Sequence, residues 1–122
     1  MIQDFLIVLM TNNLPQQRHF YNDILGLDLL FDNTDTVGLG KQSQLFIVLR
    51  EDNAKDSHHR SEQKGPQIMT FKCKGDIHDY AKKVSTSGFK VRDRLAIPEQ
   101  RSQYLFIEDY DGNEICLDCP LA

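Results

Sequence analysis

The stretch that decides the fold is FIEDYDGNEICLDC, residues 106–119, near the end of the chain. Its centre, Asp111-Gly112-Asn113, predicts a turn, because glycine adopts left-handed backbone conformations freely and Asp and Asn side chains bond to the backbone of turns. Apolar and polar residues alternate on both sides of this turn, which is typical of two paired strands. Alternation places Cys116 and Asp118 on the same face of the second strand.

The rest of the second half supplies further strands and one helix. Strands are predicted at residues 67–73, 89–92, 104–107 and 114–118, whereas residues 93–102 carry no clear pattern. A helix follows the first of these strands, because Asp76 can cap its beginning and Gly88 can end it in a left-handed conformation. This half therefore reads strand, helix, three strands.

The first half has the same order of elements. Strands are predicted at residues 5–10, 27–31, 36–39 and 45–49. A helix begins near Asn13, with Pro15 in its first turn, and ends at Gly26. Nearly the same interval separates Leu6 from Gln67 and Gly26 from Gly88. The sequence thus predicts an α+β fold of two tandem βαβββ modules.

Composition and charge limit the domain count and the partners. The chain has 122 residues, of which 40% are apolar, so we expect one domain with module 1 at about 1–50 and module 2 at about 66–120. The polar residues 51–65 between them read as a linker loop. A net charge of −4 gives no reason to expect nucleic acid.

No membrane segment is expected, because the apolar run at residues 5–10 is far shorter than the roughly 20 residues that cross a bilayer. Three cysteines, an odd number, fit a reducing compartment better than a disulfide framework. We therefore expect a cytoplasmic protein. The histidines do not form a metal-binding pattern, since His19 and His78 fall on helices and His58-His59 lie in the linker.

Two stretches resemble the vicinal oxygen chelate superfamily, which includes glyoxalase I, bleomycin resistance proteins, fosfomycin resistance enzymes and extradiol dioxygenases. NNLPQQRHFYNDILGLDLL, residues 12–30, is similar to the family's helix and its FY and LGL motif. FIEDYDGNEICLDCP, residues 106–120, is similar to its strand, DPDGN-type turn and final strand. The resemblance implies two curved sheets around a cleft, usually in a homodimer.

In metal-using members of this family, four strand residues hold a divalent ion that polarises substrate oxygens. The corresponding positions here are Leu6, Val48, Gln67 and Cys116. Leu6 and Val48 have no donor atom, and Gln67 and Cys116 pair a hard oxygen with a soft sulfur. We therefore predict no metal site and no cofactor. The alternative is a displaced divalent metal site, because a shift of two residues in the alignment keeps the same face and would bring Asp4, Glu114 or Asp118 to a ligand position.

Alternation from these positions predicts which side chains face the cleft. The cleft set is Leu6, Val8, Met10, Phe46, Val48, Arg50, Gln67, Met69, Phe71, Cys73, Tyr104, Phe106, Glu108, Glu114, Cys116 and Asp118. The opposite set should pack against the helices instead: Phe5, Ile7, Leu9, Ile47, Leu49, Ile68, Ile115 and Leu117. From the cleft set we predict the ligand-binding residues: Leu6, Phe46, Val48, Arg50, Gln67, Phe71, Tyr104, Cys116 and Asp118.

Three functions remain open on these residues. The first is a metal-independent protein that binds a partly apolar or aromatic small molecule. The second is an enzyme, either a metal-dependent lyase, isomerase or dioxygenase with displaced ligands, or a metal-free catalyst with Glu108, Glu114 or Asp118 as base. The third is a scaffold whose apolar side chains merely fill the cleft. A reactive thiol at Cys116 is disfavoured, because no histidine lies on a strand and Asp118 opposes the thiolate.

Overall fold

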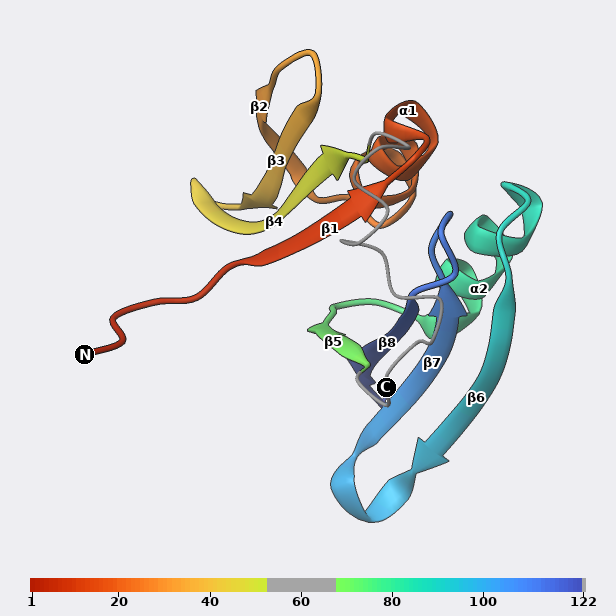
Figure 1. The fold of residues 1–122 in the computed structure, drawn as a ribbon. Helices are drawn as coiled ribbons and strands as arrows, with labels where there is room; N and C mark the ends of the chain where they lie inside the picture. Colours follow the sequence, from red (N-terminus) through yellow and green to blue (C-terminus); the bar gives the residue numbers. More distant parts are fainter. Residues whose placement is uncertain (53–67, 122) are drawn as a thin grey trace. The chain divides into compact units, whose positions relative to one another are not determined.

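The computed structural model describes residues 1–52 and 68–121 (Figure 1). The chain divides into two compact units, Met1–Gln63 and Lys64–Ala122. Most of the predicted linker, residues 51–65, lies outside the described residues. Each unit is therefore described by itself.

Unit 1 contains strand β1, a two-part helix and three further strands. Their bounds are β1 Ile7–Thr11, α1 Leu14–Arg18, η1 His19–Ile24, β2 Asp28–Asp32, β3 Thr36–Lys41 and β4 Gln44–Glu51. Within the described residues these strands form a four-stranded sheet, sheet 1, in the order β1-β4-β3-β2. β1 is parallel to β4 and the other pairs are antiparallel.

Unit 2 repeats this plan. Its elements are β5 Met69–Lys72, α2 Ile77–Thr86, β6 Val91–Ile97, the 3₁₀ turn η3 Pro98–Gln100, β7 Ser102–Glu108 and β8 Glu114–Pro120. Sheet 2, again four-stranded in the described part of the chain, has the order β5-β8-β7-β6, with β5 parallel to β8. The predicted tandem βαβββ fold is confirmed.

Capping residues lie at the beginning and end of both helices, as the sequence predicts. The Asn13 side chain accepts a hydrogen bond from the Gln16 backbone N–H at 3.2 Å, and that of Asp76 accepts one from His78 N–H at 2.8 Å. Gly26 and Gly88 end the helices with φ of 78° and 87°, a region that suits glycine alone without strain.

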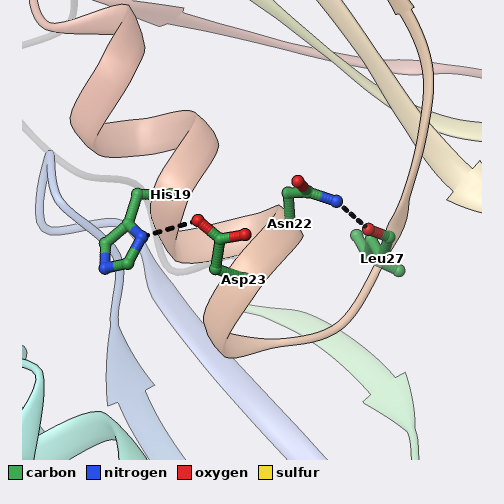
Figure 2. A network of polar contacts seen from close by, with 4 residues as sticks. All are labelled: His19, Asn22, Asp23 and Leu27. Atoms are coloured by element: carbon green, nitrogen blue, oxygen red, sulfur yellow. Dashed lines mark hydrogen bonds and ion pairs between the residues drawn. The ribbon is translucent and has the colours of Figure 1, made fainter.

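The first helix departs from the predicted α-helix after one turn. Residues His19–Ile24 form a π-helix, in which the Leu25 N–H bonds to the Phe20 carbonyl at 3.0 Å. Asn22 Nδ2 donates to the Leu27 carbonyl oxygen at 2.7 Å (Figure 2). This bond spans Gly26 and connects the end of the helix to the residues that follow it. The wider turn buries Phe20 and Tyr21 together, with ring centroids 5.0 Å apart.

The core of each unit lies between its helix and one face of its sheet. In unit 1, Ile47 and Leu49 of β4 are fully buried beside Leu39. In unit 2, Ile115 and Leu117 of β8 are buried in the same way. These residues confirm the alternation predicted for β4 and β8. Phe5 was expected to pack against the helix as well, but it precedes β1 and is 81% exposed.

A buried carboxylate, that of Asp109, stabilises the turn at Asp111-Gly112-Asn113. Asp109 is 4% exposed and accepts hydrogen bonds from the backbone N–H groups of Asp111 and Asn113 at 3.0 and 2.8 Å, and from Asn113 Nδ2 at 2.8 Å. The Asp109 carbonyl also accepts from Gly112 N–H, where φ is 79°. This network sets the register of β7 on β8, in which Phe106 pairs with Cys116.

β6 occupies the first half of residues 93–102, the stretch for which the sequence predicted no element. Its residues 92–96 are exposed, because β6 is the edge strand of sheet 2 and little of it is buried on either face. An exposed edge strand has no apolar alternation to reveal it. The sequence pattern therefore predicted only the beginning of β6, as part of the strand expected at residues 89–92.

Candidate ligand-binding site

The face of sheet 1 that points away from its helix carries mainly apolar side chains, and we call it the open face of sheet 1. It consists of Leu6, Val8, Met10, Phe31, Phe46, Val48 and Arg50, which alternation and strand register place together. Leu6 is 44% exposed, Val8 51% and Phe31 37%. Large apolar side chains are thus accessible on a regular sheet surface.

Phe31 is a member of this face that the sequence analysis missed. The ladder between β2 and β3 shifts register between Leu29 and Phe31, and this irregularity turns Phe31 to the open face opposite Gly38. A Cβ at Gly38 would collide with the Phe31 ring, so the ring lies directly on the glycine backbone. Gly38, on the strand next to Phe31, was the signal in the sequence, because a glycine within a strand often marks the place where another group lies close to the backbone.

Arg50 supplies the positive charge of this face. It is the second-last residue of β4, it pairs with Met10 of β1 on one side and Thr36 of β3 on the other, and it is exposed. The guanidinium group offers several N–H donors in one plane, a geometry that suits carboxylate and phosphate oxygens. The open face of sheet 1 therefore combines an apolar surface with a guanidinium group near its edge.

The corresponding face of sheet 2 is more polar. Strand register brings together Thr70, Tyr104, Phe106, Glu108, Glu114, Cys116 and Asp118, and we call this the open face of sheet 2. Tyr104 pairs with Asp118, and its hydroxyl donates to Gln100 Oε1 at 3.0 Å. The prediction that Tyr104, Phe106 and Glu108 share a face with Cys116 is confirmed.

The predicted faces of β5 are wrong by one residue. Met69 pairs with Ile115 and Phe71 with Leu117, so Met69 and Phe71 belong to the helix-facing side. Thr70, paired with Cys116, takes the open-face position, and Ile68 is 41% exposed instead of packing against the helix. A shift of one residue moves a whole strand's side chains to the other face. Gln67 itself lies outside the described residues.

Glu108 is held between two cations. Its carboxylate lies 3.5 Å from Lys90 Nζ and 3.9 Å from Arg92 Nη1, and its side chain is 18% exposed. Across the ladder it faces Glu114, another carboxylate. Lys90 and Arg92 offset the repulsion that two neighbouring carboxylates would otherwise suffer.

Cys116 is set up as a packed thiol rather than a nucleophile. Burial, and after it the negative charge of Asp118, raises the pKa of Cys116 above its ordinary value. Its side chain is hydrogen-bonded to that of Thr70. Because the thiolate is the reactive form, a raised pKa lowers its nucleophilicity at neutral pH.

The side chains at the family's metal positions do not fit a divalent ion. Leu6 and Val48 carry no donor, and Cys116 would need to lose its proton against a raised pKa. Among residues 1–52 and 68–121, His, Cys, Asp and Glu side chains form no group of three or more that could hold a metal.

One acidic partner of a histidine was overlooked in the sequence. His19 Nδ1 lies 2.7 Å from Asp23 Oδ2, one helical turn away in η1 (Figure 2). The pair is exposed on the helix and lies on neither sheet face. It is an ordinary i,i+4 contact of a helix surface.

None of the helices in the described part of the chain is both long and apolar enough to span a membrane.

Comparison with known proteins assigns the family. The model of the Glyoxalase/Bleomycin resistance protein/Dioxygenase superfamily matches residues 5–117. No curated protein matches the chain in sequence.

Solved structures agree on the fold. The fosfomycin resistance protein FosX from Listeria monocytogenes has a TM-score of 0.76 at 12% identity, covering 98% of this chain and 94% of its own. Lactoylglutathione lyase from Agrobacterium tumefaciens has a TM-score of 0.64 at 17% identity, covering 96% and 92%. The hypothetical protein SA1046 from S. aureus has a TM-score of 0.76 at 17% identity, covering 98% and 94%. The chain therefore belongs to the Glyoxalase/Bleomycin resistance protein/Dioxygenase superfamily.

Proposed function

We propose that this chain binds a small, partly apolar anion on the open face of sheet 1 without the help of a metal ion. The observation that carries the proposal is the set of accessible apolar side chains, Leu6, Val8 and Phe31, on one sheet face with Arg50 at its edge. Such an apolar surface with one well-placed charged group is typical of small-molecule sites.

Burial of this apolar surface would provide most of the binding energy. At about 25 cal/mol per Å², a ligand that covers about 150 Å² of apolar surface gains about 4 kcal/mol before entropic costs. An aromatic or branched ligand would contact Val8 and Phe31 without needing directional bonds. Phe46 and Val48 of β4, both half-buried, extend the same surface.

Arg50 would orient the ligand's acidic group. A planar guanidinium forms two parallel hydrogen bonds to a carboxylate or phosphonate. A FosX structure at 12% identity and a TM-score of 0.75 was solved with Mn(II) and 1S,2S-dihydroxypropylphosphonic acid, so this fold accommodates a small anion in at least one relative. That relative holds a metal, whereas the donor set of this chain does not fit one.

The polar groups of sheet 2 support a second candidate, an enzyme of the same superfamily. Glu108 and Glu114 face each other on the open face of sheet 2, and Asp118 follows on the same face. A carboxylate there could act as a general base, or the group could take part in a displaced metal site. Glu108 fits the role of base poorly, because its carboxylate is already engaged in ion pairs with Lys90 and Arg92.

We further propose that the protein is a cytoplasmic homodimer. The motive is the resemblance to a family whose sites are often completed by two chains, together with the accessible apolar side chains near the N-terminus, such as Ile2 and Phe5, which are 89% and 81% exposed. Sedimentation at micromolar concentration checks this, and a monomer would contradict it.

A ligand screen with a charge variant tests the binding proposal. Thermal shifts across aromatic carboxylates, phosphonates and their neutral analogues should reveal anionic compounds that raise the melting temperature, because a ligand of the folded state stabilises it. Arg50→Gln should weaken the best anionic compound about tenfold or more, since a charge-assisted hydrogen bond contributes about 1.5–3 kcal/mol.

The matched control is Lys82→Gln, which makes the same charge change on the exposed surface of α2. It should leave affinity unchanged, and neutral analogues should be indifferent to both variants. The proposal fails if no compound raises the melting temperature, or if the Lys82 variant loses as much affinity as the Arg50 variant.

A further inference from the structure

Two of the three cysteines lie side by side on the helix-facing side of sheet 2. The parallel ladder pairs Lys72 with Asp118, and the Cys73 N–H continues it by donating to the Asp118 carbonyl at 2.8 Å. This bond places Cys73 beside Cys119, at the end of the edge strand β5. Both are free cysteines, Cys73 half-buried and Cys119 fully buried.

Their register is compatible with a disulfide. Neighbouring strands lie about 4.8 Å apart, which falls within the range of about 4.4–6.8 Å between the Cα atoms of bonded cysteines. The two side chains leave the sheet on the same face, and the Cys73 thiol donates a hydrogen bond to the Phe71 carbonyl oxygen at 3.5 Å. Cys116 is excluded from this pair, because its pairing with Thr70 and Phe106 puts it on the opposite face.

We propose that Cys73 and Cys119 form a reversible disulfide when the reduced protein meets a hydroperoxide, and that this bond ties β5 to β8. β5 has only four residues and lies at the edge of its sheet, so backbone pairing with β8 is its main attachment. A disulfide on the helix side would fix it without entering the open face that holds Thr70, Cys116 and Asp118.

The chemistry needs only the two thiols and the peroxide. The Cys73 sulfur, as thiolate, attacks one peroxide oxygen; the O–O bond breaks, hydroxide leaves and a sulfenic acid forms. The Cys119 thiolate then attacks the Cys73 sulfur, the S–O bond breaks and a second hydroxide leaves. The two thiol protons convert both hydroxides to water, so two electrons pass from the thiols to hydrogen peroxide.

The reaction should be slow at neutral pH. Burial, and after it the neighbouring Cys119, raises the pKa of Cys73 to about 12, which keeps most of that thiol protonated. Burial raises the pKa of Cys119 as well, although its interaction with Cys73 opposes part of that rise. This pair therefore responds to sustained oxidation rather than to a brief pulse.

The deciding experiment uses Cys116→Ser, which leaves only the proposed pair. Native Cys116→Ser protein is treated with hydrogen peroxide and alkylated, and its intact mass is measured. We expect a monomer about 2 Da lighter that takes up no alkylating agent, with a melting temperature raised by several degrees, and full reversal by a thiol reductant.

The remaining variants identify the partners. Cys73→Ser and Cys119→Ser should each lose the intramolecular disulfide, and circular dichroism establishes that both are folded; Cys73→Ala serves if the serine variant is not. Because the Cys116→Ser result stands without these variants, the proposal can fail independently of them. Sulfinic acid, a dimer or unchanged thiols in native Cys116→Ser, or a Cys116–Cys119 bond in the wild type, would overturn it.

Discussion

Replacement of Asp109 by alanine is expected to lower the free energy of unfolding by about 4 kcal/mol, since it removes three hydrogen bonds to a buried carboxylate and leaves their donors without a partner. Each such bond contributes about 1.5–3 kcal/mol, although bonds that share one acceptor group do not add fully. Urea denaturation followed by circular dichroism measures the loss. The β7–β8 turn would lose the interaction that holds its register.

Asp109→Asn is the matched control for this prediction. Its amide oxygen can still accept from the backbone N–H groups of Asp111 and Asn113, but its amino group would oppose Asn113 Nδ2. The asparagine variant should therefore lose about half as much as the alanine variant. Equal losses, or a loss below about 1 kcal/mol for alanine, would show that the turn does not depend on this network.

The second large effect is expected at Gly40, in the last part of β3. A Cβ at this position would collide with the backbone carbonyl of Gln44, which cannot move without opening the β3–β4 hairpin. Gly40→Ala should therefore destabilise the protein by about 3 kcal/mol, the upper part of the range for overpacking. Thermal and urea unfolding measure it.

Gly26→Ala separates this steric effect from backbone strain. Gly26 has a φ of 78° and open space around its missing Cβ, so alanine there suffers only the cost of a left-handed conformation, about 1 kcal/mol. The Gly40 variant should be clearly less stable than the Gly26 variant. The opposite order would contradict the close contact between Gly40 and Gln44.

Features with a local cause could be predicted from the sequence. Asn13 and Asp76 cap their helices because a side-chain oxygen reaches a backbone N–H within a few residues, whatever the rest of the fold does. Gly26 and Gly88 end their helices for an equally local reason, because glycine adopts a positive φ without strain. The buried residues of β4 and β8 were predicted because long strands with one buried face alternate clearly.

Features that depend on register could not be predicted as well. The interval from Leu6 to Gln67 is one residue shorter than the interval from Gly26 to Gly88. The glycine interval makes Ile68, not Gln67, the counterpart of Leu6 in the second unit, and the observed ladders agree with it. Phe71 was therefore assigned to the wrong face. Phe31 was missed because its face depends on an irregularity in the ladder that no local pattern announces.

The candidate site divides in the same way. Val48, Arg50, Cys116 and Asp118 lie on the faces predicted for them, since β4 and β8 are long and regular. Their role in binding stays a prediction, as it does for Leu6, Phe46 and Tyr104. Thr70 takes the place that the sequence gave to a neighbour, so the polar partner of Cys116 became visible only in the structure.

Metal uptake tests the central claim, binding without a metal, most directly. The protein is treated with a chelator, dialysed, supplied in turn with Ni²⁺, Zn²⁺, Mn²⁺ and Fe²⁺, and analysed for bound metal, with a His58→Ala, His59→Ala variant to remove adventitious uptake by the linker. We predict well below one ion per chain in that variant, because Leu6, Val48 and Cys116 offer no suitable donor set. Uptake of about one ion per chain that is lost in Gln67→Ala or Cys116→Ser would contradict the claim.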